Sequence, residues 1–176
     1  MAIPAIDNVE DTVRKKGERP GRTLILGLGN ILLKDEGFGV HVAQALRDHE
    51  LPESAEVIDG GTSSLDVLLC REGIKKLIVI DVIKGGGEPG TIYRMKIDRD
   101  DRRRLGRLFS AQSPGAISLH QLGLIEALAA AEKLNIIPGE IVIIGVEPQK
   151  IEWGLELTDT LKEKVLPVTN LVLEEA

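Results

Sequence analysis

Short, unbroken runs of apolar residues, separated by polar segments, mark the chain from residue 22 onward. Such runs are typical of strands that are buried on both faces of a sheet. Parallel strands are therefore expected at residues 23–28, 55–59, 76–81 and 140–146. Residues 91–97 follow a glycine-rich turn and predict a further strand, which could pair antiparallel at an edge of the sheet.

Apolar residues also recur at helical spacing, most clearly at residues 119–133. There they occupy positions i, i+3, i+4 and i+7, which places them in one buried stripe. The stripe consists of Leu124, Ala127, Leu128 and Ala131. Ser118 and Gln121 carry a capping-box signature, so this helix is expected to begin at Leu119.

Weaker helical patterns occupy residues 37–49 and 63–73, and a last helix is expected from Thr158 onward. Pro167 lies inside that last helix and should kink or break it. The alternation of strands and helices predicts an α/β three-layer sandwich, in which a mostly parallel central sheet carries helices on both faces. We expect residues 22–176 to form a single domain and residues 1–21 to form a flexible N-terminal extension.

Composition excludes several classes of function. A net charge of −6 argues against a nucleic-acid partner, and 2% aromatic residues are too few for a base-stacking platform. Cys70 is the only cysteine, so neither an intramolecular disulfide nor a cysteine metal cage can form. No apolar run is long enough to span a membrane, and the N-terminal residues lack the apolar core of a secretory signal. We therefore expect a cytoplasmic protein without membrane insertion.

Acidic residues and one histidine follow the predicted strands. Ligands of open α/β sheets bind beyond the carboxyl ends of the strands, and there the sequence places Glu36, Asp59 and Asp81. His120 is expected in the first turn of the helix at 119–133, where the positive helix terminus favours neutral imidazole. Two carboxylates and an imidazole from separate segments suit a divalent transition metal with open coordination positions.

Each of these residues also has a purely structural interpretation. Asp35 could cap a helix, Glu36 could be a first-turn acid that the helix dipole favours, and Asp81 could accept backbone hydrogen bonds. His120 could be a core histidine whose hydrogen bonds are satisfied, or it could join a serine in a triad that no local signature supports. The residues alone leave these alternatives open.

Other motifs are incomplete or ordinary. Gly27 and Gly29 begin a dinucleotide fingerprint, but Leu32 occupies the third glycine position. Neither a P-loop nor a Gly-x-Ser-x-Gly elbow is present. His41 is interpreted as a surface residue, and so is His49. Trp153 is interpreted as a packing residue near a loop or as part of a groove rim.

The ordered motifs resemble those of the hydrogenase maturation proteases, which process the large subunits of nickel–iron hydrogenases. The first one looks like the family's Gly-x-Gly-Asn…Asp-(Asp/Glu)-Gly-x-Gly pattern. The matching segments are residues 27–39, 59–62, 80–81, 118–123, 145–148 and 154–158. The resemblance implies that Glu36, Asp81 and His120 contact a metal and act in catalysis, and that Asp59 is a second acidic site near the same cleft.

The resemblance also implies an activity. The protein would be an endopeptidase that removes a C-terminal peptide from the nickel-loaded large-subunit precursor, with no ordinary nucleophile and no tightly held zinc. The nickel would be carried by the precursor, although zinc or cadmium can take its place in such a site. We expect a monomer. The alternatives are a nickel- or precursor-binding chaperone without enzymatic activity, and a hydrolase of small substrates on the same scaffold.

Overall fold

The structure, a computed structural model, describes residues 21–63, 67, 73–97 and 119–176. The predicted extension lies outside the described residues except for Gly21, and so do Cys70 and most of the helix predicted at 63–73. None of the helices in the described ranges combines the length and apolar character that a bilayer crossing requires.

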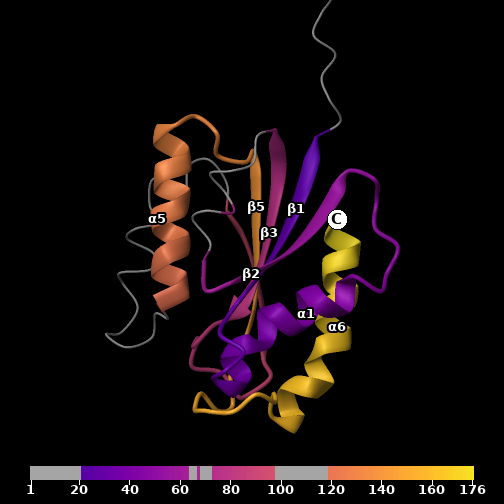
Figure 1. The fold of residues 1–176 in the computed structure, drawn as a ribbon, viewed down its shortest axis with the longest axis vertical. Helices are drawn as coiled ribbons and strands as arrows, with labels where there is room; N and C mark the ends of the chain where they lie inside the picture. Colours follow the sequence, from indigo (N-terminus) through magenta and orange to yellow (C-terminus); the bar gives the residue numbers. More distant parts are fainter. Residues whose placement is uncertain (1–20, 64–66, 68–72, 98–118) are drawn as a thin grey trace, which may run out of the picture.

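The described strands form one five-stranded sheet in the order β2-β1-β3-β5-β4 (Figure 1). Neighbouring strands run parallel except for β4, which pairs antiparallel with β5 at one edge. The strands are β1 (Arg22–Leu28), β2 (Ala55–Gly61), β3 (Ile74–Val82), β4 (Ile92–Ile97) and β5 (Glu140–Val146). This topology confirms the predicted mostly parallel sheet and its antiparallel edge strand.

Helices cover both faces of the sheet. Helices α1 (Phe38–Leu46) and α6 (Asp159–Glu175) lie on one face, and α5 (Leu119–Lys133) lies on the other (Figure 1). Successive strand residues point to opposite faces, so each strand serves two core layers. In β3, Leu77 and Val79 pack in the α5 layer, whereas Ile78 and Ile80 pack in the α1–α6 layer. The predicted three-layer sandwich is therefore confirmed.

Pro167 was expected to kink or break the last helix; α6 continues through it to Glu175, so the break is wrong, and the kink stays a prediction. A proline inside a helix removes one backbone hydrogen bond and introduces a clash with the preceding turn. Leu161 before the proline and Val168 and Val172 after it are buried in the same core cluster. The packing of both halves against one cluster offsets the local cost, because tertiary packing supplies most of the stability of a protein helix.

Helix α1 lies unusually close to the sheet. A Cβ on Gly39 would lie 2.2 Å from the carbonyl oxygen of Ile80 and 2.4 Å from that of Leu28, so only glycine fits there. The contact fixes the beginning of α1 against the carboxyl ends of β1 and β3. It thereby positions the preceding 3-10 helix, η1 (Lys34–Gly37), which contacts β3 and carries Glu36.

Candidate functional site

Asp81 is the most unusual side chain at the carboxyl end of the sheet. It lies near the end of β3 and is only 2% exposed. Its Oδ1 accepts a hydrogen bond of 2.8 Å from the backbone N–H of Val82, whereas Oδ2 is buried and has no hydrogen-bond partner in the described part of the chain. Burial raises the pKa of Asp81 to about 7, against the lowering effect of the Val82 bond, and the charge of Glu36 raises it further.

Glu36 is the residue that the structure brings to Asp81. It is half-buried in η1, and it is the carboxylate whose charge acts on Asp81. Two carboxylates in such proximity repel each other unless a proton or a cation lies between them. Because one of the Asp81 oxygens also lacks a donor, the pair offers oxygen ligands to a divalent cation.

His120 is the second residue of α5, although its side chain lies outside the description. Strand alternation places Asp81 on the same face of β3 as Leu77 and Val79, which is the face that α5 covers. The helix carrying His120 and the Asp81 carboxylate therefore share one side of the sheet. Among the described side chains, no group of three possible metal ligands is assembled. The three-residue site of Glu36, Asp81 and His120 thus stays a prediction.

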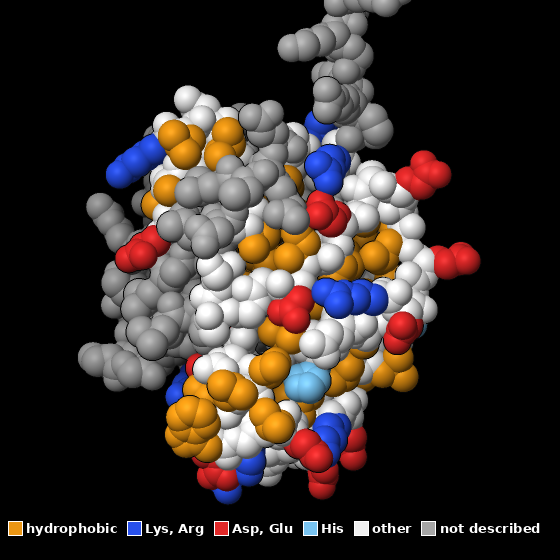
Figure 2. All heavy atoms as spheres, in the orientation of Figure 1, with side chains coloured by type: hydrophobic (Ala, Val, Ile, Leu, Met, Phe, Trp, Pro, Cys, Tyr) orange, Lys and Arg blue, Asp and Glu red, His pale blue; other side chains and the backbone are white. Residues whose placement is uncertain are grey.

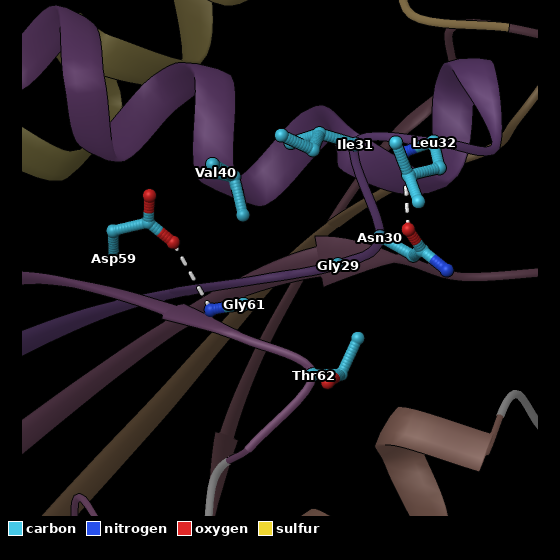
Figure 3. Close-up of a pocket in the computed structure, with 8 residues that line it drawn as sticks. All are labelled: Gly29, Asn30, Ile31, Leu32, Val40, Asp59, Gly61 and Thr62. Atoms are coloured by element: carbon cyan, nitrogen blue, oxygen red, sulfur yellow. Dashed lines mark hydrogen bonds between the residues drawn. The ribbon is translucent and has the colours of Figure 1, made fainter.

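Asp59 lies elsewhere. It is exposed in β2, and its Oδ1 accepts a hydrogen bond of 3.0 Å from the N–H of Gly61 (Figure 3). It lines a pocket of about 340 Å³, whose opposite wall is the loop after β1 with Ile31 and Leu32. Alternation in β2 groups Asp59 with Val57, which packs in the α1–α6 layer. Asp59 and Asp81 therefore lie at the same end of the sheet but on opposite faces.

His41 is the neighbour of Asp59 that sequence reasoning missed. Its interpretation as a surface residue holds only in part, because the side chain is half-buried in α1 and its Nε2 is buried without a hydrogen-bond partner among the described residues. Burial lowers the pKa of His41, and the charge of Asp59 raises it. The available signal was its position three residues after Phe38, at the border of the buried stripe. His49 is exposed, as predicted.

The loop that connects β1 to η1 is held by local hydrogen bonds. The side chain of Asn30 accepts a bond of 3.0 Å from the N–H of Leu32 and so holds the start of the loop (Figure 3). Gly29 has a φ of +139° and donates from its N–H to the carbonyl of Gly61 at 2.8 Å. A Cβ on Gly29 would lie 1.9 Å from the backbone oxygen of Glu36, so this glycine lets the loop return onto η1.

Asp35 has a structural role. It is fully buried, but it does not cap its own helix, since Leu33 and Gly37 hold the N-cap positions of η1 and α1. Its carboxylate instead accepts backbone bonds of 3.0, 2.7 and 2.7 Å and a hydroxyl bond of 3.0 Å from the segment that precedes α6. The donors are the N–H groups of Gln149, Lys150 and Thr158 and the hydroxyl of Thr158. Asp35 thus ties two distant motifs of the sequence together.

Fold and site together define an α/β protein with a mostly parallel sheet and acidic residues at the carboxyl ends of its strands. Comparison with known proteins identifies the family. The profile of the hydrogenase maturation proteases of the HycI type matches residues 40–175, so the chain belongs to this family. It is therefore an enzyme, a hydrogenase maturation endopeptidase, whose partner is a hydrogenase large-subunit precursor.

Similar proteins agree with this assignment. The hydrogenase expression/formation protein HupD of Bradyrhizobium diazoefficiens is 38% identical over 155 residues, which cover 87% of this chain and 77% of the relative. The hydrogenase 2 maturation protease of Escherichia coli is 36% identical over 86% of this chain and 88% of its own. The solved hydrogenase maturating endopeptidase HybD from E. coli superimposes with a TM-score of 0.75 at 33% identity, covering 88% of this chain and 91% of that one.

Proposed function

We propose that this endopeptidase removes a C-terminal peptide from the nickel-loaded precursor of a nickel–iron hydrogenase large subunit. In this proposal Asp81 and Glu36, together with His120, contact the nickel that the precursor carries. The observation that carries the proposal is the Oδ2 atom of Asp81, which is buried, is subject to the charge of Glu36, and receives no hydrogen bond from the described residues. A buried polar atom without a partner is costly, and such atoms concentrate at functional sites.

The ionisation of Asp81 fits this role. With a pKa of about 7, this carboxyl carries a proton in about half of the folded molecules at neutral pH. An arriving divalent cation would displace that proton and would relieve the repulsion from Glu36. The precursor would thus supply the ion that completes the site. A precursor without nickel would instead meet a site in which Asp81 keeps its proton. This difference supports selective processing of nickel-loaded substrate.

We further assign the chemical step to carboxylates and a metal-activated water molecule. A cation at Asp81 and Glu36 would polarise the scissile carbonyl or acidify a water molecule. Asp59 is a second catalytic candidate, because its exposed carboxylate lines the pocket. Gly61 lines the same pocket, and a Cβ added to it would meet no described atom within 4 Å, so the backbone there is accessible. An extended tail could approach the backbone there. We place this activity in the cytoplasm and expect the enzyme to act as a monomer.

The decisive experiment compares two forms of one substrate. Purified enzyme would be mixed with nickel-loaded and with nickel-free large-subunit precursor, and mass spectrometry would follow the precursor's C-terminus. We expect loss of the tail from the nickel form only, and zinc or cadmium in the precursor would show whether another ion can substitute. Binding of the nickel form without any cleavage would instead identify a chaperone and contradict the proposal.

A further inference from the structure

A group of apolar side chains stands on the surface next to the Asp59 pocket. We call it the Trp153 patch; it consists of Ile31, Leu32, Trp153 and Leu155. Trp153, the only tryptophan in the chain, is 80% exposed and Leu155 is 67% exposed. The interpretation of Trp153 as a packing residue is therefore wrong. Figure 2 shows hydrophobic side chains gathered at the end of the molecule where Figure 1 places the chain before α6.

Backbone hydrogen bonds fix the two loops that carry the patch against each other. The N–H of Lys34 donates to the carbonyl of Gly154 at 2.8 Å, and the N–H of Gly154 donates to the carbonyl of Leu32 at 2.9 Å. The buried carboxylate of Asp35 anchors both sides of the second loop through Lys150 and Thr158. The exposed apolar side chains therefore stand on a backbone that is already fixed and needs no ordering when a partner binds.

The border of the patch is charged but balanced. Glu152 lies 2.6 Å from the ammonium of Lys34 and 3.0 Å from that of Lys150, and Glu156 pairs with Lys162 at 2.8 Å. An apolar centre with a paired polar rim is the usual anatomy of a protein–protein interface. An anionic membrane or a nucleic acid would instead require an excess of unpaired positive charge.

The patch is also continuous with the pocket. Ile31 and Leu32 belong to the patch and at the same time form the pocket wall opposite Asp59 (Figure 3). A chain held in the pocket would therefore lie against two residues of the patch. A second copy of this protein bound to the patch would compete with a bound chain for Ile31 and Leu32, which belong to both surfaces.

Resting on the proposed function, we infer that the Trp153 patch docks an apolar surface on the folded body of the large-subunit precursor, next to the tail that is cut. Trp153 is the anchor of this contact, and the pocket then receives the tail. The enzyme thus recognises its substrate through two features, the folded body at the patch and the carried metal at Asp81 and Glu36. Residues of the patch determine specificity and take no part in the chemical step.

Alanine substitutions in the patch test this inference, and alanine substitutions of exposed leucines elsewhere on the surface serve as matched controls. Trp153→Ala should raise KM for the nickel-loaded precursor about 30-fold, as loss of an interface anchor does, and should change kcat less than about twofold. Leu155→Ala should raise KM several-fold. Leu134→Ala and Leu166→Ala are the controls, because these side chains are 59% and 61% exposed elsewhere on the surface. They should leave KM unchanged, and all four variants should keep the wild-type thermal unfolding curve.

A binding measurement separates this inference from the proposed function. The affinity of each variant for immobilised nickel-loaded precursor would be measured by biolayer interferometry, independently of cleavage. If the wild-type protein binds the precursor without cleaving it and Trp153→Ala binds more weakly, the docking surface stands and the proposed function fails. An unchanged KM and affinity in Trp153→Ala would refute the docking surface while leaving the function intact. Self-association that disappears in Trp153→Ala would identify a second copy as the occupant and also refute it.

Discussion

Two buried aspartates at the same end of the molecule differ in what surrounds them. Asp35 is fully buried, and its two oxygens accept bonds from three backbone N–H groups and one hydroxyl. Asp81 is 2% exposed, accepts one bond at Oδ1, and has no partner at Oδ2. Both carboxyls are removed from water, but only one of them has its hydrogen-bonding capacity filled by the protein.

This difference shows that burial alone does not mark a functional acid. A buried carboxylate whose oxygens are both satisfied by the protein stabilises the fold, whereas one with an oxygen left without a donor, and subject to the charge of a second carboxylate, is available to a ligand. The adjacent residues Asp35 and Glu36 differ in the same way: one is structural and the other belongs to the candidate site. Asp35 holds the loop before α6, whereas the charge of Glu36 acts on Asp81. A sequence motif that reads as one acidic unit therefore contains one structural and one functional residue.

The largest expected effect is loss of processing in Asp81→Asn. The amide keeps the shape and the Val82 hydrogen bond but cannot ionise or bind a divalent cation well, so the rate should fall at least about 1000-fold. The rate would be measured as cleavage of nickel-loaded precursor per folded enzyme. Asp48→Asn, at an exposed turn, is the control and should retain wild-type activity. Normal processing by Asp81→Asn would place the metal contact elsewhere.

The same substitution should change how stability depends on pH. The pKa of Asp81 rises from 3.8 to about 7 on folding, so the folded state holds a proton that the unfolded state has lost between these values. The contribution of Asp81 to the free energy of unfolding therefore falls by about 4 kcal/mol as the pH rises from about 4 to about 7. Above that range it stays at the lower value. Asp81→Asn abolishes this dependence. Relative to wild type, it should gain about 4 kcal/mol between pH 4 and pH 8.

Chemical denaturation of both proteins at several pH values, with a chelator present, would measure this difference. Taking the difference between the two proteins cancels the titration of carboxylates that do not interact with Asp81, including Glu175 and Glu140, whose pKa values are lowered by neighbouring cations. A pH-independent difference would mean that the Asp81 carboxyl is solvated in solution, which would remove the central observation of the proposed function.

Asp35→Ala should act on stability instead of chemistry. It leaves the N–H groups of Gln149, Lys150 and Thr158 without their acceptor, which should lower the free energy of unfolding by about 3 kcal/mol. Thr158→Val removes only the hydroxyl bond and should lower it by about 1 kcal/mol. Urea unfolding measures both values. Asp35→Ala with wild-type stability and no activity would reverse the assigned roles of the two aspartates.

Most of the fold could be predicted from the sequence, because apolar periodicity is a local signal. The unbroken run at residues 76–81 predicted a strand buried on both faces, and Leu77 and Ile78 indeed serve opposite core layers. Pro167 was misjudged, because the packing of Leu161 and Val172 on both sides of it is a tertiary effect that no local rule contains.

The site could be predicted from the sequence only in part. The strand ends correctly indicated one edge of the sheet for Asp59 and Asp81, and the structure places Glu36 beside Asp81. The faces of the sheet were not predicted, because the side on which a strand residue lies depends on which helix covers that side. For the same reason the sequence could not show that His41 lies beside Asp59, or that Asp35 reaches across to Thr158.

The separation of the two faces predicts a small effect at His41. Burial lowers the pKa of this imidazole and the charge of Asp59 raises it, so Asp59→Asn should lower it further. Asp81→Asn should leave the pKa of His41 unchanged, because Asp81 lies on the face that α5 covers. Asp48→Asn is the control and should show how much an exposed charge affects this pKa. Titration of the imidazole by NMR would measure all three. If Asp81→Asn shifted His41 as much as Asp59→Asn does, the two carboxylates would belong to one cluster, and the contrast between a metal-contacting face and a pocket face would be wrong.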